Sequence, residues 1–297
     1  MRLRPLLSAA LFSAILASGP AVAQAPRGLG DLGAARAAET GDPVDVELVL
    51  AVDVSWSMDL SEQAIQREGY AAAFRSEEVQ RAITEGNHGR VAVTYIEWAG
   101  AFSQSVVVPW TLIDSKESAE SFAYSLGKTT PIRARRTSIA SAIDFSAPLF
   151  DNNGYAGQRR VIDISGDGPN NQGPLVTQSR DDATRRGITI NGLPLMTTDT
   201  AMGSNWGSIS NLDEYYADCV IGGPGAFSIP VTSWDQFPLA VRRKLVLELA
   251  GLWPNMRRDE GARDGTVIRI QSEEPTDCTV GESMWQDRQR FWMDGVQ

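Results

Sequence analysis

The chain has 297 residues, and 37 acidic against 27 basic side chains give it a formal net charge of −10. A chain this acidic gains little from releasing the counterions of a phosphate backbone, so we expect no nucleic-acid partner and favour cations as ligands. The length suits one large domain with a sizeable core and some additional segments.

The first 23 residues have the pattern of a signal peptide. Basic Arg2 and Arg4 precede an apolar stretch, which Ala21-Val22-Ala23 closes with an Ala-x-Ala cleavage signal. The apolar stretch is too short to cross a bilayer, and no other segment is apolar for long enough, although an uncleaved anchor is the alternative. We therefore expect a mature protein without a membrane span, periplasmic or secreted, in a Gram-negative bacterium. Removing the two arginines leaves 25 basic and 37 acidic residues, a net charge of −12.

Residues 24–43 are predicted to be a flexible leader. They are rich in glycine and alanine and lack sustained periodicity. Residues 28–33 match G-x-G-x-x-G, but a dinucleotide fingerprint must follow a strand and open a helix. No strand pattern precedes this match, so we reject it.

Residues 44–250 alternate between strand and helix patterns. The first strand is a nearly continuous apolar run that ends in Asp53, as in strands buried on both faces. The predicted strands are Val46–Val52, Val91–Trp98, Ser105–Trp110, Arg160–Ser165, Ile188–Leu195 and one near Ala226–Pro230. The predicted helices lie at about 60–82, 115–127, 138–149, 211–217 and 235–250. This order predicts a doubly wound α/β domain, with a mainly parallel sheet flanked by helices and the strand carboxyl ends along one edge.

Residues 251–297 form a predicted C-terminal appendage, with one further strand pattern at Gly265–Ile270. The chain has two cysteines, Cys219 and Cys278. In an exported protein an even pair favours one disulfide, worth about 4 kcal/mol in the chain-entropy model. Such a bond would tie the appendage to the domain. Two separately buried thiols are the alternative.

The strongest local motif is Asp53-Val54-Ser55-Trp56-Ser57, at the end of the first strand. A turn leaving a strand can point alternate side chains at one spot, so a carboxylate and two hydroxyls converge there. These hard oxygen donors suit Mg²⁺, Mn²⁺ or Ca²⁺ rather than zinc. Helix capping explains the same residue types equally well when the motif is taken alone.

Two further oxygen donors favour the metal interpretation. Thr137 opens a predicted helix, and Asp167 follows the fourth strand between two glycines. The ends of the first and fourth strands can be neighbours at the switch point of a parallel sheet, where ligands bind.

Together Asp53-x-Ser55-x-Ser57, Thr137 and Asp167-Gly168 resemble the metal-ion-dependent adhesion site of von Willebrand factor A and integrin I domains. The resemblance covers about residues 44–250. Through the segments 165–171 and 220–227 the chain is also similar to a family of exported bacterial proteins of unknown function with this fold.

The resemblance implies a role for each matching residue. Ser55 and Ser57 would bind the metal directly, Thr137 directly or through water, and Asp53 and Asp167 would supply negative charge. The last coordination position would accept a carboxylate from a protein partner.

Two departures from the family pattern affect this expectation. Gly166 stands between Ser165 and Asp167, where the family usually has Thr or Ser directly before its Asp. Arg133, Arg135 and Arg136 surround Thr137, where the family usually has glycine. Positive charge at this loop weakens cation binding or, alternatively, helps to hold an acidic ligand.

The sequence therefore predicts a divalent-cation-dependent binding module and no enzyme. No G-x-S-x-G, Walker A or H-E-x-x-H motif is present, and the single histidine, His88, has no nucleophile motif beside it. A metal-free structural or interaction protein is the first alternative, and a metal-dependent hydrolase is the second. Asp163 interrupts an apolar strand, and we expect a hydrogen bond or an arginine partner for it.

Overall fold

The computed structural model describes residues 41–128, 133–197, 208–250 and 276–294. The strands are β1 (Asp42–Asp53), β2 (Val91–Trp98), β3 (Gln104–Ile113), β4 (Tyr155–Gly166) and β5 (Ile188–Pro194). The α-helices are α1 (Leu60–Arg75), α2 (Glu77–Thr84), α3 (Lys116–Leu126), α4 (Ile139–Ser146), α5 (Val176–Arg185), α6 (Leu212–Tyr215), α7 (Phe237–Leu249) and α8 (Val280–Asp294). Short 3₁₀ turns lie at η1 (Ala147–Phe150) and η3 (Trp234–Gln236), and a π-helical turn, η2 (Tyr216–Val220), follows α6.

The five strands form one sheet in the order β3-β2-β1-β4-β5. β1 runs parallel to β2 and β4, and β4 runs parallel to β5, whereas β3 is antiparallel to β2 at the edge. The carboxyl ends of β1 and β4 are therefore neighbours, with Val52 opposite Ser165. The predicted doubly wound, mainly parallel α/β architecture is confirmed.

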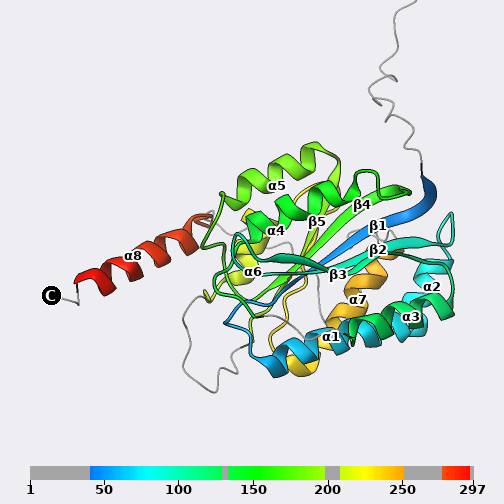
Figure 1. Ribbon diagram of the computed structural model, residues 1–297, viewed down its shortest axis with the longest axis horizontal. Coiled ribbons are helices and arrows are strands. Elements are labelled where there is room, and N and C mark those ends of the chain that lie inside the picture. Colours follow the sequence, from blue (N-terminus) through cyan, green and yellow to red (C-terminus); the bar gives the residue numbers. More distant parts are fainter. Residues whose placement is uncertain (1–40, 129–132, 198–207, 251–275, 295–297) are drawn as a thin grey trace, which may run out of the picture. The chain divides into compact units, whose positions relative to one another are not determined.

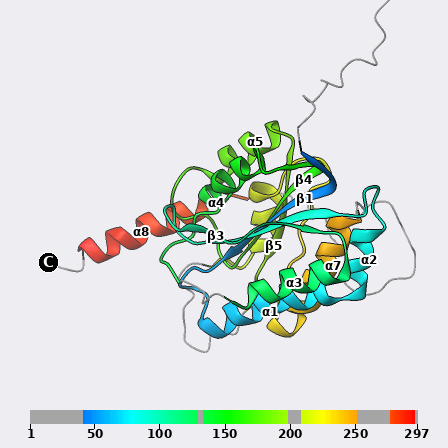
Figure 2. The ribbon, with the colours of Figure 1, turned by 45° about the vertical axis from the view of Figure 1, so that its right-hand side comes forward.

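Helices cover both faces of this sheet. Helices α1, α2, α3 and α7 pack on one face, and α4, α5 and α6 pack on the other (Figures 1 and 2). Strand β1 lies between these layers, so alternate side chains enter opposite cores. Leu48 and Leu50 join the first core, and Val49 and Ala51 join the second, all of them fully buried. This explains why β1 is a continuous apolar run rather than an alternating one.

The helix predicted over 60–82 is two helices in the structure. The chain breaks at Ser76, which is extended, with φ −75° and ψ 143°. Its hydroxyl donates to the Ala73 carbonyl at 2.7 Å and accepts from the Val79 amide at 3.4 Å. One serine thus ends α1 and caps α2, a role for which serine is well suited.

The segment predicted as a strand near Ala226–Pro230 forms no ladder. It runs beside β5 through isolated bridges, Gly192 with Ser228 and Leu195 with Val231. The segments 1–23 and 24–43 lie outside the described residues except for 41–43, and so does the strand predicted at Gly265–Ile270.

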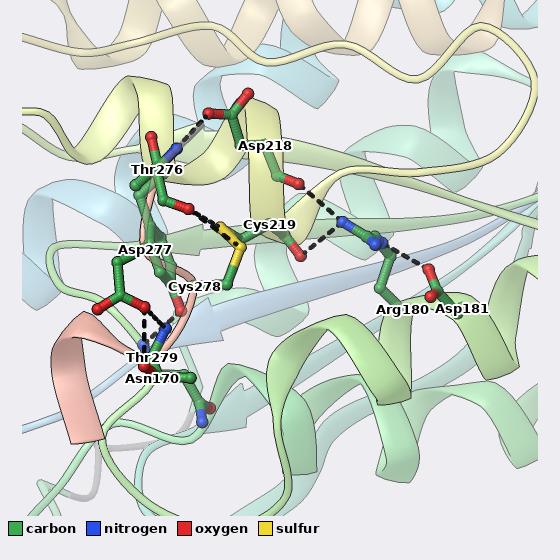
Figure 3. The surroundings of a disulfide bond; sticks show 10 residues. Asn170, Arg180, Asp181, Asp218, Cys219, Thr276, Asp277, Cys278 and Thr279 are labelled. Atoms are coloured by element: carbon green, nitrogen blue, oxygen red, sulfur yellow. Dashed lines mark hydrogen bonds and ion pairs between the residues drawn. A yellow bond between two sulfur atoms is a disulfide. The ribbon is translucent and has the colours of Figure 1, made fainter. Parts of the chain in front are cut away.

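The predicted disulfide is confirmed, because Cys219 and Cys278 are bonded with their Cα atoms 5.5 Å apart. Figure 3 shows the bond and two hydrogen bonds to Asp218 beside it. The Thr276 amide donates to the Asp218 carboxylate at 3.1 Å, and Arg180 donates to the Asp218 carbonyl at 2.8 Å. The bond therefore joins the segment that leads into α8 to the π-helical turn η2.

Candidate metal centre

Four of the five predicted donors form one connected group at the carboxyl ends of β1 and β4. Asp53 is the last residue of β1, and Asp167 directly follows β4. The hydroxyl oxygens of Ser55 and Ser57 lie 2.7 Å apart, and the Ser57 hydroxyl donates to the Asp167 carboxylate at 2.8 Å. The Asp53 carboxylate accepts the Ser55 amide at 2.7 Å. The turn after β1 therefore directs its side chains at the carboxylate that follows β4.

The fifth predicted donor, Thr137, lies in a loop fixed to both strand ends. Three residues before it, Ala134 bridges Ser55 and donates to the Val54 carbonyl at 3.3 Å. The Thr137 amide donates to the Asn171 side chain at 3.0 Å, and the Asn171 amide donates to the Thr137 carbonyl at 2.9 Å. The fold thus brings together the three segments that the sequence pattern assigned to one site.

The side chains of this group become more buried from Ser57 to Asp53. Ser57 is exposed, whereas Ser55 is buried and Asp53 is fully buried. The Oδ2 atom of Asp53 has no hydrogen-bond partner among the described residues. A buried carboxylate oxygen without a partner is costly, and a bound cation is one of the few groups that can satisfy it.

The pKa values of both carboxyl groups are raised. Burial raises the pKa of Asp53 well above its usual range, and the neighbouring Asp167 charge raises it further. Burial raises the pKa of Asp167 to about 6, although the hydrogen bond from Ser57 opposes the shift. Two adjacent carboxylates thus repel each other where water is scarce, and a divalent cation would relieve that repulsion.

The donor set has the chemistry of a hard-cation site. It offers two carboxylates and three hydroxyls, and carboxylate, hydroxyl and water oxygens suit Mg²⁺ or Mn²⁺. The described part of the chain holds no group of three or more His, Cys, Asp or Glu side chains placed to bind a metal. A site built mainly from hydroxyls does not require such a group, so this donor set fits the predicted ion.

Gly166, one of the two departures, has a packing reason. A Cβ atom at this position would lie 3.1 Å from Asp53 Oδ2, 3.0 Å from the Tyr216 hydroxyl and 3.2 Å from the Trp98 ring. A side chain here would therefore press directly on the base of the site. Trp98 packs beneath the site, whereas Trp56 is exposed at its rim.

The arginines, the second departure, each contact a partner outside the donor group. Arg133 donates to the Trp56 carbonyl at 2.8 Å, and the guanidinium of Arg135 lies 4.3 Å from the centre of the Trp56 ring. Arg136 lies over the ring of Trp285 in α8. The three cations thus surround the site, and among the described residues none of them forms an ion pair with Asp53 or Asp167.

Several supporting residues were missed in the sequence. The side chains of Gln63 and Gln66 in α1 donate to the carbonyls of Val54 and Asp53 at 3.4 and 3.2 Å. Asn170 is fully buried, accepts from the Ala140 amide at 3.0 Å and donates to Glu282 of α8 at 2.7 Å. The polar positions in the otherwise buried face of α1 were the available signal for the glutamines. No local pattern links Asn170 to α8.

A mainly parallel sheet with an antiparallel edge strand, covered by helices on both faces, matches the von Willebrand factor A-like α/β fold. The chain belongs to the family described as protein of unknown function (DUF1194), whose model matches residues 43–253.

Several solved structures are similar to this chain at low sequence identity. The pilus adhesin SpaC from Lactobacillus rhamnosus GG aligns with a TM-score of 0.50 and 11% identity, over 69% of this chain and 31% of that one. Proximal thread matrix protein 1 from the mussel byssus aligns with a TM-score of 0.49 and 12% identity, over 71% and 49%. A von Willebrand factor type A protein from Catenulispora acidiphila aligns with a TM-score of 0.47 and 14% identity, over 69% and 43%. This chain therefore spans less than half of each, and no curated protein matches it.

Proposed function

We propose that this protein is a divalent-cation-dependent binding module that captures a carboxylate of a protein partner in the cell envelope or outside the cell. The observation that carries the proposal is the unpartnered, fully buried Asp53 Oδ2 beside the linked group of Ser55, Ser57 and Asp167. Negative charge and hydroxyl oxygens are gathered there without a neutralising group among them.

The five donor residues would contribute to metal binding in different ways. Ser55 and Ser57 would hold Mg²⁺ or Mn²⁺ directly, Thr137 directly or through water, and Asp53 and Asp167 would supply the compensating charge. The bound ion supplies Lewis acidity for one external carboxylate. Ser57 is exposed and Asp167 is half-buried, so an external group can approach from the solvent side.

Binding explains the arrangement better than hydrolysis does. Metal-assisted hydrolysis needs a base near the metal. The single histidine, His88, contacts Asp45 through its backbone amide and Gln158 through its ring. Asp45 lies near the start of β1, so this histidine is at the opposite edge of the sheet from Asp53. We therefore propose no catalytic role for His88.

The disulfide supports the part of the proposal that places the protein outside the cytosol. Disulfides such as Cys219–Cys278 persist mainly outside the reducing cytosol. The described helices include none with the length and apolar character needed to cross a bilayer. The disulfide agrees with the signal-peptide pattern of residues 1–23.

The proposed function is tested by measuring which proteins this protein captures in the presence and in the absence of the metal. Immobilised protein is exposed to envelope and secreted proteins of the source cells in Mg²⁺ or in EDTA, beside an Asp53→Asn variant. We expect a defined partner that is retained in Mg²⁺, released by EDTA and absent from the variant. Identical capture under all three conditions would contradict the proposal.

A further inference from the structure

We propose that the rim of the metal centre recognises an acidic protein segment, with one carboxylate at the metal and further carboxylates at a basic rim. This basic rim consists of Arg133, Arg135 and Arg136. The inference rests on the proposed function and specifies the chemistry of the partner.

The first part of the rim is built on the metal-binding turn itself. Trp56 lies between Ser55 and Ser57, and 53% of it is exposed. The Arg135 guanidinium stacks over its ring at 4.3 Å. A stacked guanidinium keeps its in-plane N–H groups available for a carboxylate, which it can bind with two parallel hydrogen bonds. Arg133 is exposed and is held to the same turn through the Trp56 carbonyl.

The second part of the rim depends on α8. Arg136, which directly precedes Thr137, stacks on Trp285, and a second cation, Arg288, lies 5.5 Å from the centre of the same ring. The disulfide holds Cys278 two residues before α8 begins, in the neighbourhood of Asn170 (Figure 3). Helix α8 thus brings positive charge to the Thr137 loop although it lies beyond residues 43–253, which the family model matches.

Of the acidic side chains that follow the metal-binding turn, Asp59 offsets only part of the rim's charge. Its pKa is lowered mainly by the hydrogen bond from Ser61 and to a smaller extent by the charge of Arg133. Asp59 caps α1 by accepting the Glu62 amide at 2.8 Å and the Ser61 hydroxyl at 2.6 Å. Glu62 accepts the Asp59 amide at 2.7 Å and the Trp234 ring N–H at 3.0 Å. In the part of the chain that the structure describes, no carboxylate forms an ion pair with Arg133, Arg135 or Arg136.

Charge complementarity favours an acidic protein segment over a nucleic acid. The whole chain carries a net charge of −10, so three arginines around one site are a local exception. A long polyanion would extend beyond the rim over a chain of negative net charge, whereas a short acidic segment engages only the metal and the arginines.

Two matched peptides test the inference, acetyl-Gly-Asp-Glu-Glu-Gly-amide and acetyl-Gly-Asp-Gln-Gln-Gly-amide, each titrated into the full chain in Mg²⁺ and followed by NMR. We expect the triply acidic peptide to bind about tenfold more tightly, because it adds charge-assisted hydrogen bonds to arginine. Arg135→Gln should lose most of this gain, and Arg135→Lys should keep only part of it.

Arg185→Gln is the matched control, because Arg185 is an exposed arginine at the end of α5, which leads to the opposite edge of the sheet. This variant should bind both peptides as the wild type does. Equal affinity for the two peptides, or an unchanged preference in Arg135→Gln, would overturn the inference. Tighter binding of an oligodeoxythymidylate than of the acidic peptide would also overturn it.

A parallel Mn²⁺ titration separates this inference from the proposed function. Arg135→Gln should bind Mn²⁺ at least as tightly as the wild type, since it removes a nearby positive charge. If the wild type binds Mn²⁺ but does not distinguish the peptides, only the acidic-partner inference fails. If the wild type binds no Mn²⁺, the proposed function itself fails.

Discussion

At the residue scale, charge is buried at the candidate metal centre, in the ion pairs Arg67–Glu97 and Arg160–Glu47, and in a cluster at Lys244. Lys244 pairs with Asp163 at 2.5 Å and with Glu248, and Glu248 accepts from the Asn191 side chain at 2.8 Å. The sequence predicted a hydrogen bond or an arginine partner for Asp163, and the structure gives it a hydrogen-bonded ion pair with a lysine of α7. One cation faces two carboxylates, so burial and Glu248 raise the pKa of Asp163 to about 7 despite the opposing effect of Lys244.

This raised pKa predicts a pH dependence of stability. An unfolded aspartate loses its proton near pH 3.9, about three units below folded Asp163, so the native state alone holds the proton between these values. Asp163 therefore makes stability fall as pH rises from about 4 to about 7. In Asp163→Asn the side chain stays neutral, and the fall in unfolding free energy between pH 5 and pH 8 should be smaller.

Urea unfolding at the two pH values measures this difference. Asp235→Asn, which changes an exposed carboxylate, is the control and should keep the wild-type pH dependence. The same dependence in Asp163→Asn as in the wild type would show that Asp163 is not the group responsible.

A second prediction at this scale concerns Gly166. An alanine methyl there would press on Asp53 Oδ2, the Tyr216 hydroxyl and Trp98, so Gly166→Ala should destabilise the fold by about 1–3 kcal/mol through overpacking. Gly127→Ala is the matched control, because its nearest contact would be an ordinary 3.7 Å. Equal unfolding midpoints for the two variants would contradict the packing explanation.

At the element scale, the sequence predicted the strands better than the helices. Strands β1, β2, β4 and β5 were recognisable because they are mostly buried on both faces, which requires continuous apolar runs. Strand β3 is partly exposed and was recognisable from its consecutive valines, Val106–Val108. Helix α5 was missed because it buries only Val176, Ser179 and Ala183, too few apolar residues for a periodic signal. Helix α8 was missed because apolar residues such as Phe291 and Met293 are exposed rather than arranged along a buried face.

The main prediction at this scale concerns the contribution of the disulfide to the free energy of unfolding. It links residues 59 positions apart, and loop closure of that length stabilises by about 4 kcal/mol in the chain-entropy model. Replacing both Cys219 and Cys278 with serine should lower the unfolding free energy by about that amount, measured by urea denaturation. A variant with the wild-type midpoint would show that the bond adds nothing to stability.

At the scale of the whole molecule, topology is what assembles the candidate metal centre. Asp53 and Asp167 are far apart in sequence and become neighbours only because β1 pairs with β4. That much followed from the strand pattern and from the resemblance to adhesion-site domains. The stacking of Arg136 on Trp285 did not, because it depends on where the disulfide holds α8.

The metal-binding variants can be chosen to keep this topology intact. Asn is nearly isosteric with Asp, so Asp53→Asn removes the buried charge with little change in packing. Ser57 is exposed, so Ser57→Ala removes a donor without disturbing the core. If both variants bind the metal more weakly, the loss of binding comes from the removed ligands and not from a loss of the fold.

The most direct test of the central claim is calorimetric titration of the mature protein with Mn²⁺ and Mg²⁺, beside Asp53→Asn and Ser57→Ala. The account predicts saturable binding at one site in the wild type, abolished in Asp53→Asn and weakened in Ser57→Ala. Absence of binding in the wild type, or equal binding in all three proteins, would contradict it.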